Sequence, residues 1–159
     1  MRSVLMVGPS AAPPVFNAGS TSPGGSSGTY TGITAVQIAV PQSGRLSSLS
    51  IYWTTGGGVN FFLGLYSDSS GKPSTLLASS AMSTSQALWN KLPIVSGPTL
   101  GAGNYWVAVQ NQSGVAGNYN AGGAGAWNNG ATWTGALPAT FPFASSGAFQ
   151  YSMYATFNE

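Results

Sequence analysis

The sequence predicts an all-β protein, folded as a two-sheet antiparallel β-sandwich of jelly-roll type with about eight strands. Apolar residues recur at every second position in several windows, which is the period of a half-buried strand. No window has the apolar spacing or the Glu, Lys and Ala content of a stable helix. Because open sheet edges invite aggregation, we expect a closed sandwich or strands paired by oligomerisation.

The N-terminal region is expected to be an extended arm, over residues 1–32, preceding a sandwich over 33–159. Residues 8–32 are rich in Pro, Gly, Ser and Thr and carry no charge and no periodic apolar face. We expect the large apolar residues of this arm to lie against a neighbouring subunit, with a floppy terminus as the alternative. These residues are Val15, Phe16 and Tyr30.

Eight strands are expected along the chain. They fall at 3–7, 34–40, 49–53, 61–65, 76–77, 88–92, 105–109 and 149–157. The last is the clearest, because apolar and polar residues alternate without a break over nine positions. Asp68 begins a turn that runs to Pro73, and a turn role is favoured over a calcium ligand because partner carboxylates are lacking.

Residues 111–147 do not follow the strand period and are expected to form a long Gly-rich loop. The segment has eight glycines among 37 residues, no charge, and aromatic residues between Asn, Ala and Ser. Aromatic faces beside amide side chains suit sugar recognition. The candidate binding residues are Tyr119, Trp127, Asn128, Asn129 and Trp133. The alternative is that the two tryptophans form the loop's own small core or fill an intersubunit contact.

The scarcity of charge excludes most catalytic chemistry. Only 4% of the 159 residues are charged, and there is no His and no Cys. Two carboxylates, Asp68 and Glu159, make neither a glycosidase pair nor a metal site. We therefore expect no enzyme activity, no cofactor and no metal. A net charge of +2 from scattered cations also disfavours nucleic acid as a partner.

Targeting signals are weak. The apolar run at residues 4–7 is shorter than a signal-peptide core, and nothing approaches the roughly 20 apolar residues of a membrane span. We expect a protein that is not embedded in a membrane. Because charged residues are depleted at the centres of protein interfaces, the composition also favours a permanent homo-oligomer.

Residues 46–110 contain a succession of strand-core and turn motifs: Leu49 to Trp53, Leu63 to Asp68, Gly71 to Pro73, Thr75 to Ala78, Trp89-Asn90 and Leu100 to Val109. On these motifs the segment resembles β-sandwich modules of bacterial surface proteins and of tailed-phage virion proteins. The resemblance implies a jelly-roll module used for attachment or surface display, and it carries over no functional residue.

The favoured function is a structural virion protein of a tailed bacteriophage, most specifically a head decoration or cement protein that binds the capsid surface. Its partners would be copies of itself, as a trimer on the strength of the viral resemblance, and a capsid or tail protein. The alternatives are a tail-fibre receptor-binding protein and a carbohydrate-binding module on a bacterial cell surface. Both would use the 111–147 loop, with a surface glycan as the partner.

Overall fold

The computed structural model describes residues 11–159, and within them every regular element is a β-strand. The strand predicted at residues 3–7 lies outside the described residues. The strands are β1 (Val15–Gly19), β2 (Ser26–Tyr30), β3 (Ile33–Val40), β4 (Gly44–Trp53), β5 (Asn60–Ser69), β6 (Lys72–Ser79), β7 (Ser83–Thr84), β8 (Leu88–Pro93), β9 (Thr99–Leu100), β10 (Gly103–Asn111), β11 (Val115–Asn128), β12 (Ser145–Tyr151) and β13 (Met153–Asn158).

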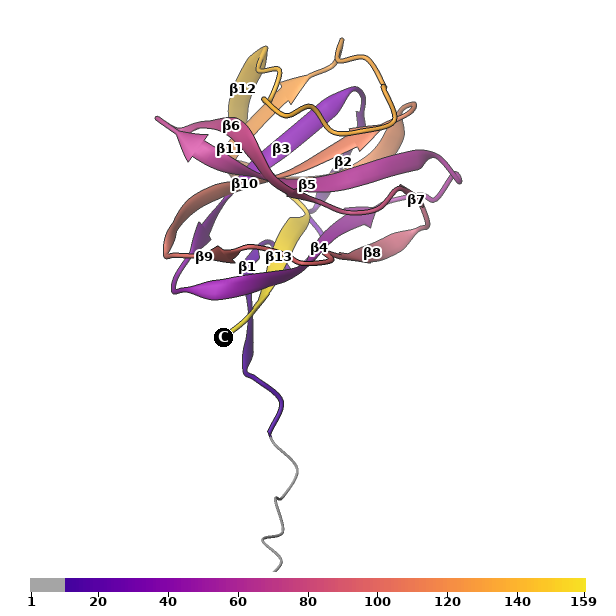
Figure 1. Cartoon of the computed structure of the whole chain (residues 1–159). Coiled ribbons are helices and arrows are strands. Elements are labelled where there is room, and N and C mark those ends of the chain that lie inside the picture. Colours follow the sequence, from indigo (N-terminus) through magenta and orange to yellow (C-terminus); the bar gives the residue numbers. More distant parts are fainter. Residues whose placement is uncertain (1–10) are drawn as a thin grey trace, which may run out of the picture.

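The strands form two layers, joined by one long strand (Figure 1). One layer holds β1, β13, β4, β8 and β9, and the other holds β3, β10, β5 and β6. β11 links them, because it pairs with β4 at Gly117 and with β3 further along. Every named strand pair is antiparallel, as the predicted all-β sandwich requires.

The main hydrophobic core lies between the two layers. Alternate residues of β4 and β13 face it from one layer, and alternate residues of β3, β5 and β10 face it from the other. Fully buried examples are Leu49, Ile51, Met153 and Phe157 on one side and Val36, Leu63 and Val107 on the other. The apolar residues that recur at every second position in the sequence are therefore the residues that form this core.

A second, smaller core lies on the outer face of the β3, β10 and β5 layer. Ile33, Tyr66 and Trp106 point to that face and are covered by the connection between β11 and β12, residues 129–144. This covering connection appears in orange above the sheet in Figure 1. Leu137 and Phe141 insert into the cluster, and the Tyr66 hydroxyl donates to the Pro138 carbonyl oxygen at 2.8 Å. Both faces of this layer are therefore buried.

The all-β class and the two-sheet sandwich are confirmed, but the strand count of about eight is wrong. Thirteen strands are present in residues 11–159. The extra strands are short, like β7 and β9, or rich in Gly, Ser and Asn, like β2, β11 and β12. Such strands have no alternating apolar pattern that a sequence could reveal.

The boundaries expected for the arm and the loop also differ in the structure. Within the expected arm, β1 pairs with β13 and β2 pairs with β11, so both belong to the sandwich. Within the expected 111–147 loop, residues 115–128 form β11, and β12 begins at Ser145. The glycines explain this: a Cβ at Gly117 would meet the Tyr30 ring at 2.5 Å, so the missing side chain lets the aromatic residue pack on the strand.

Candidate functional site

Two of the residues predicted to bind sugar meet at the β11–β12 pair. The Trp127 ring contacts the Phe149 ring at a centroid distance of 5.6 Å, and the Tyr119 ring contacts Phe149 at 5.4 Å. All three side chains are half-buried, and Tyr119 and Phe149 pack against the main core. These rings therefore serve mainly to close one margin of the sandwich.

The other three predicted residues do not join these rings. Trp133, in the covering connection, stacks on Phe62 with the ring centroids 5.2 Å apart, so it helps to cover the second core. The Asn128 side chain donates to the Pro142 carbonyl oxygen at 2.8 Å and accepts from the Gly130 N–H at 3.0 Å. Asn129 is exposed. The structure does not bring the predicted set together as one site, and the alternative weighed for Trp133, a core of the loop's own, describes its packing.

The residues expected to grip a neighbouring subunit mostly serve this chain's own core. Phe16 stacks on Phe157 at a centroid distance of 5.1 Å. Tyr30 is buried, and its hydroxyl donates to the Asn118 carbonyl oxygen at 2.6 Å. Burial, with Tyr151 and Tyr119 close by, raises the pKa of Tyr30 well above its ordinary value. Only Val15, which is 65% exposed, projects towards solvent.

A different aromatic cluster lies on the solvent side of the β13, β4 and β8 layer. It consists of Tyr154, Tyr52 and Trp89, one from each strand, and is called here the outer aromatic face. Trp89 contacts Tyr154 at 5.0 Å and Tyr52 at 5.4 Å between ring centroids, in both cases edge to face. All three side chains are half-buried, so part of each ring meets solvent.

Strand alternation explains why these rings point outward. Ile51 and Trp53 face the main core, so Tyr52 between them must face the other way. The register then aligns the strands, because Tyr52 is opposite Trp89 and Ser50 is opposite Tyr154. The rings of Trp89 and Tyr154 thus meet across β4.

Small serine side chains form the floor beside these rings. Ser48 and Ser50 are 3% and 0% exposed, and neither hydroxyl oxygen has a hydrogen-bond partner among the described residues. Larger residues flank them in register, with Lys91 and Pro93 on β8. A hollow of about 320 Å³ opens here, lined by Ser47, Ser48, Lys91 and Pro93, and it is called here the serine hollow.

The polar groups of the outer aromatic face, which adjoins the serine hollow through Ser50 and Lys91, are free to bind a ligand. The hydroxyls of Tyr52 and Tyr154 and the Trp89 indole N–H make no hydrogen bond within residues 11–159. An unpaired buried hydroxyl is unfavourable, so Ser48 gains free energy from any polar group that enters the hollow. Ring faces next to hydroxyl donors and acceptors fit a carbohydrate, which has apolar C–H faces and many hydroxyls.

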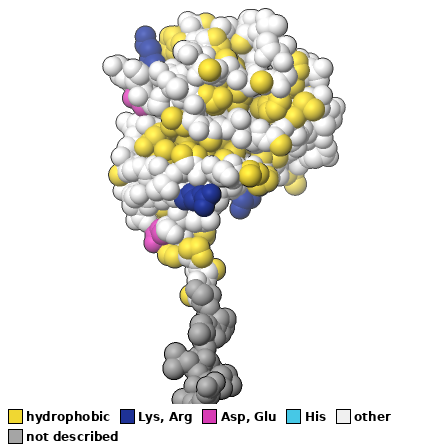
Figure 2. All heavy atoms as spheres, in the orientation of Figure 1, with side chains coloured by type: hydrophobic (Ala, Val, Ile, Leu, Met, Phe, Trp, Pro, Cys, Tyr) yellow, Lys and Arg dark blue, Asp and Glu magenta, His cyan; other side chains and the backbone are white. Residues whose placement is uncertain are grey.

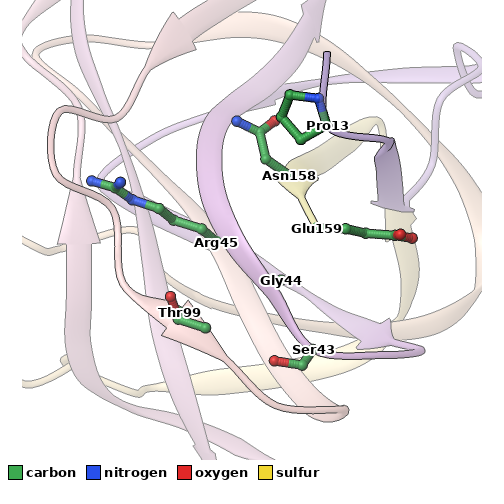
Figure 3. A pocket seen from close by; sticks show the side chains of 7 residues that line it. All are labelled: Pro13, Ser43, Gly44, Arg45, Thr99, Asn158 and Glu159. Atoms are coloured by element: carbon green, nitrogen blue, oxygen red, sulfur yellow. The ribbon is translucent and has the colours of Figure 1, made fainter. Parts of the chain in front are cut away.

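A second hollow lies where Pro13 approaches the C-terminal residues Asn158 and Glu159 (Figure 3). It has a volume of about 390 Å³ and is lined by Pro13, Ser43, Gly44, Arg45, Thr99, Asn158 and Glu159. Its charged side chains are engaged elsewhere: Arg45 donates to the Gly97 carbonyl oxygen at 3.2 Å, and Gln42 donates to Glu159. Figure 3 shows the Arg45 and Glu159 side chains pointing to opposite sides of this hollow, so they do not converge on a common ligand.

The sequence contains a signal for two residues of the outer aromatic face. The polar faces of 48–54 and 149–157 contain Tyr52 and Tyr154, which are large aromatic residues on faces that otherwise hold Ser, Thr and Asn. Two large aromatic residues on otherwise polar strand faces could have indicated a binding surface. The strand register that places Trp89 beside both rings cannot be deduced from the sequence.

Residues 11–159 contain no group of three His, Cys, Asp or Glu side chains that could hold a metal ion. No helix in that range is long and apolar enough to cross a membrane.

Comparisons with known proteins give a fold likeness only. No family model matches the chain, and no curated protein matches it. The structure resembles that of the clostridial cysteine protease Cwp84 after propeptide cleavage, with a TM-score of 0.59 and 14% identity over 95% of this chain and 41% of that chain. A structure of the cysteine protease and lectin-like domains of Cwp84, a surface-layer-associated protein of Clostridium difficile, gives a TM-score of 0.53 and 13% identity over 86% of this chain and 37% of that one.

The chain thus spans about two fifths of the length of these structures, and the likeness shows that it shares a fold with part of them. A structure of infectious bursal disease virus gives a TM-score of only 0.35, at 13% identity over 92% of this chain and 32% of that chain. That value is too low to support an argument from a shared fold.

Proposed function

We propose that this chain is a non-enzymatic attachment module that binds carbohydrate at the outside of a bacterial cell or virus particle. The observation that carries the proposal is the outer aromatic face, where Tyr52, Trp89 and Tyr154 meet beside unpaired serine hydroxyls. The likeness to a structure that includes lectin-like domains supports the same class. A chain without His or Cys supports the absence of catalysis.

The test compares aromatic substitutions on two surfaces. Trp89→Ala and Tyr154→Ala remove rings from the outer aromatic face, and Trp127→Ala, at the β11–β12 pair, is the matched control. We expect each of the first two variants to weaken binding by about two- to tenfold, because one aromatic stacking contact contributes roughly 0.5–1.5 kcal/mol. Binding is measured by affinity electrophoresis in gels containing soluble polysaccharides, and thermal unfolding confirms that each variant is folded.

The opposite pattern of binding results would place the carbohydrate site at the β11–β12 pair. If Trp127→Ala abolished binding and the other two variants bound normally, the β11–β12 rings would be the binding surface, as the sequence first suggested. If the unsubstituted protein bound no polysaccharide, the proposed carbohydrate function would be wrong.

A second candidate function is a structural role in a tailed-phage particle, as a head decoration or tail-fibre protein that forms a homo-oligomer. Two observations favour it. β1 stands at the end of the strand order, and the residues leading into it, 11–14, are exposed. Charged side chains are also few on the face shown in Figure 2, as at the centres of protein interfaces.

Light scattering tests this role. The full chain is compared with a form that begins at Val15, which keeps β1 and β2 and therefore the sandwich. A full-length oligomer, such as the expected trimer, that becomes a monomer on truncation would support assembly through the N-terminal segment. Two monomers at all concentrations would contradict it.

A further inference from the structure

The outer aromatic face carries one cationic side chain at a place where a bound sugar would reach it. Lys91 follows Trp89 by two residues on β8, so both side chains point to the same side, about 7 Å apart along the strand. Lys91 also lines the serine hollow with Ser48. A sugar stacked on the ring would therefore direct its next substituents towards the ammonium group.

No acidic side chain competes for this cation within residues 11–159. Lys91 makes no ion pair in that range. The carboxylate of Asp68 accepts hydrogen bonds from Trp106 and Gln37 on the other layer. The only other carboxylate side chain, that of Glu159, accepts from Gln42 near the second hollow. The positive charge beside the outer aromatic face is therefore uncompensated.

We infer that the serine hollow selects carbohydrates that carry a carboxylate group, with Lys91 binding the carboxylate, Ser48 bonding a sugar hydroxyl and Trp89 stacking on the ring. This inference rests on the proposed carbohydrate function and adds the ligand class to it. The buried, unpaired Ser48 hydroxyl at the same hollow is the second, independent observation, because it marks a polar group without a partner.

The experiment compares polysaccharides that carry carboxylate groups with a neutral one. Polygalacturonate and its fully methyl-esterified form share one backbone, and alginate and hyaluronate extend the carboxylate set. The full chain is compared with Lys91→Gln, and with Lys72→Gln as the matched control. Lys72 lies on β6, where its ammonium group sits 4.8 Å from the Phe143 ring centroid, away from the outer aromatic face.

We expect at least one carboxylated polymer to bind about two- to fivefold more tightly per site than its neutral counterpart, which is the range of an exposed ion pair. Lys91→Gln should remove that preference without abolishing binding, and Lys72→Gln should keep it. Raising the salt concentration to 1 M should also remove it, because the screening length then falls to about 3 Å.

The results separate failure of the inference from failure of the function. Equal binding of charged and neutral polymers, or an equal effect of the two lysine substitutions, would overturn the selectivity for carboxylates. If Trp89→Ala still weakened binding in that case, the carbohydrate function would stand. Binding of none of these polymers, charged or neutral, would overturn both.

Discussion

At the scale of single residues, Asp68 shows how the few charges of this chain are used. Its carboxylate accepts hydrogen bonds from the Trp106 indole at 2.7 Å, from Gln37 at 2.8 Å and from the Gly71 N–H at 3.1 Å. The bond from Gly71 closes the turn that the sequence predicted. With its oxygens engaged by three donors, Asp68 fastens β5 to β3 and β10, which is a different role from the calcium ligand weighed as the alternative.

Asp68 should make the stability depend on acid pH. Burial opposes ionisation, but the hydrogen bonds from Trp106, Gly71 and Gln37 outweigh it and lower the pKa of Asp68 below its ordinary value. Below about pH 4 the unfolded chain therefore binds this proton more readily, so the stabilisation is present above that pH and is lost as the pH falls. Urea unfolding between pH 2 and 6 should show this slope.

Two variants check that assignment. Asp68→Asn should flatten the acid slope of the free energy of unfolding, and Trp106→Phe should reduce it in part by removing the indole donor. An unchanged slope in Asp68→Asn would show that another group causes the pH dependence.

At the scale of elements, the covering connection turns a loop into part of the fold. Phe141 is 4% exposed and meets the Tyr66 ring edge to face at 5.4 Å. Main-chain bonds hold the connection as well, since the Phe141 N–H donates to Ser74 and the Leu76 N–H donates to Ala139. These bonds also protect the outer edge of β6 from pairing with other chains.

Removing the Phe141 ring should therefore cost stability without affecting ligand binding. Phe141→Ala is expected to lower the free energy of unfolding by about 3–5 kcal/mol, as for other buried phenylalanines. Carbohydrate binding should persist at temperatures where the variant is folded, because the outer aromatic face lies on the opposite layer. Val95→Ala, at a residue 89% exposed, is the control and should change stability by less than about 0.5 kcal/mol. A loss below about 1 kcal/mol in Phe141→Ala would mean that the connection is not part of the folded core.

A strand was predicted well from the sequence where its own side chains alternate between apolar and polar residues. β3 and β10 have apolar residues on every second position and were found close to their true positions. The single strand expected at 149–157 is divided in the structure between the end of β12 and β13, with a break at Ser152. β11 and β12 depend on glycines that leave room for rings of neighbouring strands: a Cβ at Gly117 would meet Tyr30 of β2, and one at Gly147 would meet Trp127 of β11. A glycine that accommodates a distant ring is indistinguishable in the sequence from a glycine in a loop.

At the scale of the whole molecule, contacts between distant strands explain why the candidate site in the structure differs from the one that the sequence predicted. The sequence correctly predicted a β-sandwich. It also predicted that Trp127 and Trp133 bind a ligand, because both residues fall in a segment that was expected to be a loop. The folded chain uses Trp133 to cover the second core and Trp127 to contact Phe149. Trp89 gains its neighbours only through the register of β4, β8 and β13, which no local pattern records.

The most direct test of the carbohydrate site is a nuclear magnetic resonance titration of the indole N–H signals of the full chain. Each of the five tryptophans gives one signal, assigned by single Trp→Phe variants. Oligogalacturonate and cello-oligosaccharides are added as charged and neutral probes. The account predicts a saturable shift of the Trp89 signal with at least one probe, while the buried Trp53 and Trp106 signals and the Trp127 and Trp133 signals stay in place. A saturable shift at Trp127 with Trp89 unchanged, or no shift with any probe, would contradict it.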